Sequence, residues 1–106
     1  MDKKLEERLI ESAIEAVNTF GAPQQMRHTQ EECAELIASI NHWFRGREGS
    51  EEEVAEELAD VIIMCAQMCD IFVCDIFERS GYDMEKVIFK KLDKLDEQIA
   101  EEEADR

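Results

Sequence analysis

The 106-residue chain has little that interrupts a helix, with one proline and four glycines. It is also poor in basic residues, since 12 lysines and arginines stand against 27 aspartates and glutamates, for a net charge of −15. Scarce helix breakers together with high apolar and charged fractions favour an all-α domain. The acidic balance argues against a nucleic-acid partner, because contact with the phosphate backbone needs a basic face. It is compatible with cation binding.

Targeting and membrane signals are also missing. The N-terminal segment MDKKLEER has no apolar signal core, which predicts a cytoplasmic protein. The longest apolar stretch, residues 61–77, is interrupted by Asp70 and Asp75, so we expect no membrane span. No P-loop glycine pattern, nucleophile elbow or Cys–His signature occurs, which excludes P-loop ATPases and acyl-transfer enzymes.

The four cysteines form no CxxC pair and no zinc-finger spacing, so zinc is not expected. Cys65 and Cys69 lie one helical turn apart on an apolar face. We therefore expect both to be buried free thiols.

Hydrophobic periodicity predicts four helices, at about residues 3–19, 23–44, 51–79 and 84–99. The sequence SEEE at 50–53 fits a capping box, with Gly81 as the C-cap of the third helix and Asp83 as the N-cap of the fourth. We expect a single domain over residues 1–106, with a solvated acidic tail at about residues 100–106.

The third helix is apolar on nearly every side over residues 61–77. Such a helix has to be buried on every side. Three other helices in a chain this short cannot easily enclose it. The sequence therefore predicts a homo-oligomer, a dimer or larger, in which this helix also packs against another subunit.

Two acidic pairs occupy matching places on the second and third helices. Glu32 and Glu35 lie at one edge of the apolar face of the second helix, and Glu57 and Asp60 lie at the same edge of the third. If these helices pack as neighbours, the four carboxylates converge. Four ionised carboxylates repel one another unless some are protonated or a cation compensates them. Oxygen ligands with room for water suit Mg²⁺ or Mn²⁺.

A simpler interpretation of the same pairs stays open. A quarter of the chain is acidic, so acidic residues three apart occur by chance, and acids in a first helical turn complement the helix dipole. Either pair alone then marks a solvated helix face. The matched geometry of the two pairs favours a site.

The segments QEECAELIASINHWFRGR and EEVAEELADVIIMCAQM resemble the MazG-like family of all-α nucleoside triphosphate pyrophosphohydrolases. That family carries E-x-x-E on one helix and E-x-x-D on the next, about twenty residues on. Here these residues are Glu32 and Glu35, then Glu57 and Asp60. The resemblance covers roughly residues 20–95.

The resemblance implies a dimer or tetramer of helical bundles with Mg²⁺ held by these four side chains. It also implies hydrolysis of an NTP or dNTP between the α- and β-phosphates, to a monophosphate and pyrophosphate, in nucleotide-pool house-cleaning. Glu32 or Glu35 would orient or deprotonate the attacking water.

The fourth helix carries Lys91 in the middle of its apolar face, with Lys94 at the border. A buried lysine needs a partner, and carboxylates or a substrate phosphate would serve. A lysine whose stem packs while its ammonium reaches water is the alternative. The family has a lysine here followed by asparagine and arginine, whereas this chain has Leu95 and Gln98 near those places. Of the basic residues of this helix, Lys91 and Lys94 are expected to bind phosphate.

Four residues are weaker candidates for contact with the nucleobase. His28 lies one turn before Glu32, and Trp43 is the sole tryptophan. Phe20 and Gln25 lie at the start of the second helix, at base-pocket positions by the resemblance. For His28 and Trp43, a structural role or core packing is the competing interpretation.

Two other functions remain open from sequence. One is a related pyrophosphohydrolase acting on another nucleotide, such as phosphoribosyl-ATP. The other is a non-catalytic helical module that binds divalent ions or a protein partner, which predicts stabilisation by metal without turnover.

Overall fold

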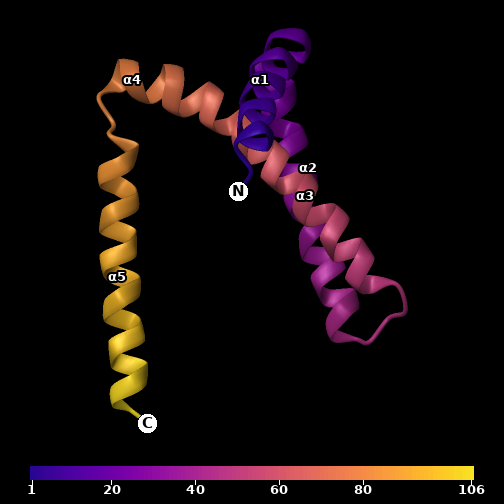
Figure 1. Cartoon of the computed structure of the whole chain (residues 1–106), viewed down its shortest axis with the longest axis vertical. Helices are drawn as coiled ribbons and strands as arrows, with labels where there is room; N and C mark the ends of the chain where they lie inside the picture. The colour runs from indigo at the N-terminus through magenta and orange to yellow at the C-terminus, as the bar shows by residue number, and fades with distance from the viewer.

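The computed structural model describes residues 1–106 and contains helices and short connections only (Figure 1). The elements are α1 (Lys3–Phe20), α2 (Ala22–Phe44), α3 (Ser50–Met68), the π-helical η1 (Cys69–Ile76), α4 (Phe77–Ser80) and α5 (Met84–Ala104). The backbone stays right-handed helical at both junctions of η1, so α3, η1 and α4 form one continuous helix. The predicted all-α, four-helix chain is therefore confirmed.

Local sequence signals set most of the helix ends. The Asp2 carboxylate accepts hydrogen bonds from the first backbone amides of α1, and Pro23 lies in the first turn of α2. Gly81 ends α4 in the left-handed region, at φ 82°, where a residue without Cβ is favoured. Asp83 then caps α5 by accepting from the backbone amide of Lys86 at 3.3 Å.

One predicted helix cap and one predicted helix end are wrong. No capping box forms at Ser50, because Gly49 holds the N-cap position and the Glu53 carboxylate instead contacts Nδ1 of His42 at 2.9 Å. The last helix does not fray at Ile99 but continues to Ala104. The additional residues are glutamates and alanines, which are good helix formers, and no glycine or proline stops the helix.

The helices form a hairpin with an arm (Figure 1). α2 and α3 run antiparallel and pack along their length, and α1 packs against α2, α3 and η1. η1 and α4 lead away from this bundle, and α5 turns back and stands apart from it. The Cα radius of gyration is 17.1 Å, whereas a compact domain of about 100 residues has about 13 Å. No helix is long and apolar enough to cross a membrane.

The best-buried residues of α2 and α3 follow seven-residue spacings, which return a side chain to the same face after two turns. On α2 these residues are Gln25 and Ser39. On α3 and η1 they are Ser50, Met64 and Ile71, and Gln67 is the one buried residue of α3 outside this series. Glu32 and Glu57 occupy the missing positions of the two series. The seam between α2 and α3 is therefore largely polar, and the carboxylates lie within it.

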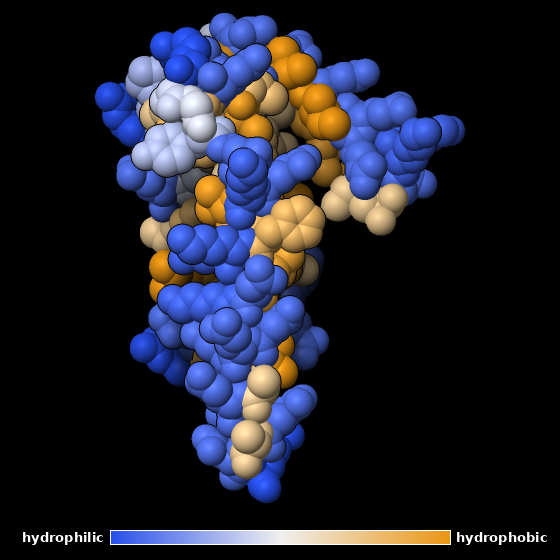
Figure 2. Space-filling view, turned by 90° about the vertical axis from the view of Figure 1, so that its left-hand side faces the viewer, coloured by the Kyte–Doolittle hydropathy of each residue, from blue (hydrophilic) through white to orange (hydrophobic).

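The apolar faces expected to form the core are consequently only half covered. Ile37, Leu58 and Ile62 are exposed in the single chain. The faces of α2 and α3 that pack against each other are the polar ones, so the apolar faces point elsewhere. Cys65 and Cys69 are free but exposed, so their predicted burial is wrong. The space-filling view from the side of α4 and α5 shows hydrophobic side chains scattered among charged ones (Figure 2).

Candidate functional site

Three of the four predicted carboxylates converge where α2 faces α3. Three carboxylate oxygens lie within 4.8 Å of one another, one each from Glu32, Glu35 and Glu57. The first two lie one turn apart on α2, and Glu57 reaches them from α3. Glu31 and Glu56, the neighbours in sequence, are exposed, as expected for solvated residues. Helical spacing therefore predicted the meeting of three of the four carboxylates, and their role as metal ligands stays a prediction.

The cluster holds more negative charge than the protein compensates. Burial raises the pKa of the Glu32 carboxyl, and the charge of Glu35 raises it further, while the hydrogen bond from His28 lowers it. Burial also raises the pKa of Glu57. The charge of Glu35, and a hydrogen bond between the Glu35 and Glu57 carboxyls, raise it further. Asp60 adds to both shifts. The Oε2 atoms of Glu32 and Glu57 are both enclosed, and neither has a hydrogen-bond partner.

A divalent cation fits this donor set. Enclosed carboxylate oxygens without partners are costly, and a cation would satisfy both of them and offset the mutual repulsion. The donors are oxygens only, with no cysteine or histidine nitrogen among them, which suits Mg²⁺ or Mn²⁺ better than zinc. Glu32, Glu35 and Glu57 would bind the ion directly.

Asp60 lies beside the cluster and is exposed. It lines, together with Glu32, a cavity of about 420 Å³ between α1, α2 and α3. The remaining lining residues are Ala16, Phe20, Gln24, Gln25, His28, Ile63, Met64 and Gln67. A cavity of this size, partly apolar and carboxylate-lined at one side, is in the range of small-ligand sites.

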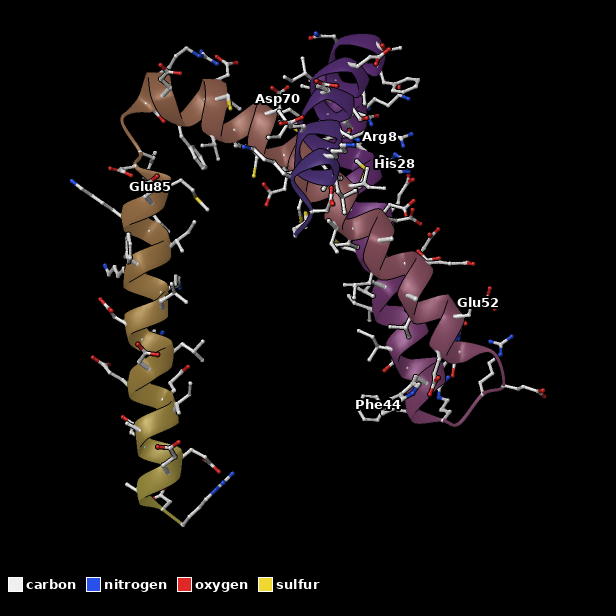
Figure 3. The ribbon with its side chains drawn as sticks, viewed as in Figure 1. Arg8, His28, Phe44, Glu52, Asp70 and Glu85 are labelled. Atoms are coloured by element: carbon white, nitrogen blue, oxygen red, sulfur yellow. The ribbon has the colours of Figure 1, made fainter.

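Three of the weaker candidates lie in this cavity. His28 projects where α1, α2 and α3 come together (Figure 3), and its Nε2 contacts Oε1 of Glu32 at 3.0 Å. Phe20 and Gln25 line the same cavity. Gln25 is buried, and its amide donates a hydrogen bond of 2.7 Å to Oε1 of Gln67. Sequence reasoning missed Gln67, although its place seven residues after Asp60, as the one amide within an apolar run, was a usable signal.

Trp43, Lys91 and Lys94 are not brought to this site within the chain. Trp43 lines a separate hollow with Ile40, Glu51 and Val54 near the α2–α3 loop. Both lysines are exposed on α5, which begins near Glu85 on the far side of the molecule from His28 (Figure 3). The expectation that Lys91 is buried does not hold in the single chain, because α5 has no helix packed on its apolar face.

The raised pKa values predict how stability varies with pH when no metal is bound. A carboxyl with a raised folded-state pKa stabilises the protein below its ordinary pKa of 4.5, and this contribution is lost as pH rises through the folded-state pKa. We expect the melting temperature of metal-free protein to fall as pH rises above 4.5, and to fall less in the variant E32Q/E57Q. The exposed pair E31Q/E56Q removes the same charge and should keep the wild-type slope. Equal slopes in the two double variants would contradict a shared cause in the cluster.

Comparison with known proteins gives one match. A family model described as the MazG nucleotide pyrophosphohydrolase domain matches residues 20–101, which include every carboxylate of the cluster. No curated protein and no solved structure matches the chain.

Proposed function

Because the chain belongs to the MazG nucleotide pyrophosphohydrolase domain family, we propose that it hydrolyses nucleoside triphosphates or deoxynucleoside triphosphates to the monophosphate and pyrophosphate. In this proposal the reaction requires Mg²⁺ and serves nucleotide-pool house-cleaning. The observation that carries this proposal is the meeting of Glu32, Glu35 and Glu57, with two enclosed oxygens lacking partners, beside a cavity. Family membership indicates nucleotide pyrophosphohydrolase activity, and the cluster supports a metal-dependent form of it.

In this proposal Glu32, Glu35, Glu57 and Asp60 hold Mg²⁺, for which Mn²⁺ can substitute. When bound, the ion supplies positive charge that neutralises phosphate oxygens as negative charge develops on them. The α2–α3 seam keeps Glu32 and Glu57 in place, since each of them lies between residues that are buried two turns before and two turns after it.

The general base is Glu35 or Glu32. Glu35 is the exposed member of the cluster, so water reaches it directly. Oε1 of Glu32 is already engaged by His28. Of the two, the structure therefore favours Glu35 for orienting the attacking water and taking its proton, with Glu32 and His28 as its fixed neighbours.

The nucleobase is proposed to bind near Phe20, Gln25 and His28, at the side of the cavity formed by α1 and the start of α2. For Lys91 and Lys94 to bind phosphate, as for Trp43 to touch the base, a second copy of the chain has to bring them to the site. Their positions in the single chain are part of the reason for proposing a homo-oligomer.

The exposed apolar residues of α5 support self-association. They recur along one helix that makes no extensive contact with the other helices of the chain: Val87, Ile88, Phe89, Leu92, Leu95 and Ile99. Sedimentation equilibrium is expected to give a mass of at least twice 12.3 kDa. The variant F89E/L92E should shift the protein towards the monomer, whereas K90E, which changes the net charge by the same amount, should not. A wild-type monomer would exclude the proposed assembly.

The test of the activity is pyrophosphate release from a panel of NTPs and dNTPs, with and without Mg²⁺. We expect release that depends on the metal and ranks the nucleotides. No release from any of them, while Mg²⁺ still raises the melting temperature, would favour a non-catalytic ion-binding module. The position of both lysines outside the site keeps that second function in view.

A further inference from the structure

A buried pair of amide side chains closes one end of the cavity. Gln25 is 4% exposed and Gln67 is 5% exposed. The Gln25 amide nitrogen donates to the Gln67 amide oxygen at 2.7 Å. This bond uses one group of each side chain and leaves the oxygen of Gln25 and the nitrogen of Gln67 without a protein partner. Neither belongs to the fully enclosed atoms without partners, so both retain access to the cavity that the two residues line.

The two free groups differ in kind. The Gln25 oxygen is an acceptor, and the Gln67 nitrogen carries hydrogens to donate. If the oxygen and nitrogen of both amides were exchanged, Gln67 would donate to Gln25, and one donor and one acceptor would again be free. The cavity wall therefore offers a donor beside an acceptor in either arrangement.

The amides lie a fixed distance from the carboxylates. Gln25 precedes Glu32 by seven residues on α2, and Gln67 follows Asp60 by seven on the antiparallel α3. Seven residues are two turns, or about 10.5 Å along each helix. The cavity thus has a carboxylate end and an amide end, with Phe20 as its aromatic wall. A nucleotide has the same order, with charged phosphates at one end and a flat hydrogen-bonding base at the other.

We propose that Gln25 and Gln67 together read the hydrogen-bonding edge of the nucleobase, which makes Gln67 a specificity-determining residue. This inference rests on the proposed function and assigns the base end of that site. Nucleobase edges place a donor beside an acceptor, and proteins read them with such groups beside a stacking side chain. Because the pair is buried, a ligand without a base leaves the two free groups without hydrogen-bond partners. Polar sites of this kind discriminate strongly against ligands that cannot make the hydrogen bonds.

The test compares nucleotides with ribose 5-triphosphate, which has the phosphates and sugar but no base. Binding is measured by equilibrium dialysis, with Ca²⁺ in place of Mg²⁺ to suppress turnover. We expect at least one nucleotide to bind wild-type protein at least about tenfold more tightly than ribose 5-triphosphate. In the variant Q25L/Q67L, which removes both amides and leaves neither orphaned, this advantage should disappear, while binding of ribose 5-triphosphate is unchanged.

Two further variants separate recognition from folding. Q30L removes an exposed amide of α2 outside the cavity and should keep the wild-type preference. Q67E keeps the shape and the acceptor for Gln25 but loses the free donor, so it should change the ranking of bases. The new buried charge should lower the melting temperature, and retained binding of ribose 5-triphosphate shows that the site is still folded at the temperature of the assay. Equal loss of nucleotide and ribose 5-triphosphate binding in Q25L/Q67L, or a base preference that survives it, would overturn the inference.

Pyrophosphate release distinguishes failure of this inference from failure of the proposed function. Hydrolysis with equal kcat/KM for nucleotides and ribose 5-triphosphate would reject base reading and leave the activity standing. Base-dependent binding with no hydrolysis would reject the activity and leave base reading standing. No binding and no hydrolysis would reject both.

Discussion

The variant E57Q is expected to lower kcat/KM for pyrophosphate release by at least about 100-fold. Groups that only support metal ligands already cost 10- to 100-fold when replaced, so a carboxylate in direct contact with the ion should cost no less. Glutamine keeps the shape of Glu57 but removes the charge from the one residue of α3 within the cluster. The measurement is steady-state pyrophosphate release at saturating Mg²⁺.

The matched control for this variant is E56Q. Glu56 is the preceding residue of the same helix and is exposed, so its replacement removes the same charge without touching the cluster. Its kcat/KM should stay within about twofold of wild type, since the phosphate site is screened from a surface charge by solvent and salt. Equal loss in E56Q and E57Q would mean that net charge, and no defined cluster, governs the rate.

The second large effect is expected for stability in M64A. Met64 is 3% exposed on the face of α3 that packs in the bundle and lines the cavity, so truncation leaves a void that the stiff seam cannot close. Replacing a buried large apolar side chain by alanine costs about 2–5 kcal/mol, a large part of the total stability of a small domain. Urea unfolding monitored by circular dichroism measures the loss.

Ile10→Ala is the comparison for M64A. Ile10 is on α1 and is 60% exposed, so its truncation removes apolar atoms that are mostly in contact with water already. The expected loss is under about 1 kcal/mol. If the two variants lost the same free energy of unfolding, the α2–α3 seam would not be the part of the molecule that holds the fold together.

The sequence predicted the carboxylate cluster because helical spacing alone determines which side of a helix a residue occupies. Glu32 and Glu35 had to share one side of α2, and Glu57 the corresponding side of α3. A short loop then brings the two helices together as antiparallel neighbours. Helical spacing and the packing of α2 on α3 together bring the three residues to one place.

Other features depended on packing that local patterns do not encode. Ser39 was not predicted to be buried, because serine is assigned to the surface by default, yet it has no exposed area and bonds the carbonyl of Leu36 at 2.8 Å. Gln67 was missed for the same reason. The burial of the apolar faces was overestimated, since which face a helix covers is decided by its neighbours. The position of α5 depends on what it packs against, which the residues of α5 alone do not determine.

The π-helical segment η1 changes the direction in which the chain leaves the bundle. A π-helix has more residues per turn than an α-helix, so the eight residues Cys69–Ile76 turn the chain through a smaller total angle than eight α-helical residues would. If η1 were a regular α-helix, α4 and α5 would leave the bundle on another side, while every carboxylate of the cluster would stay where it is, because all of them precede η1. The winding of η1 therefore sets the orientation of the outer arm and takes no part in the chemistry at the centre.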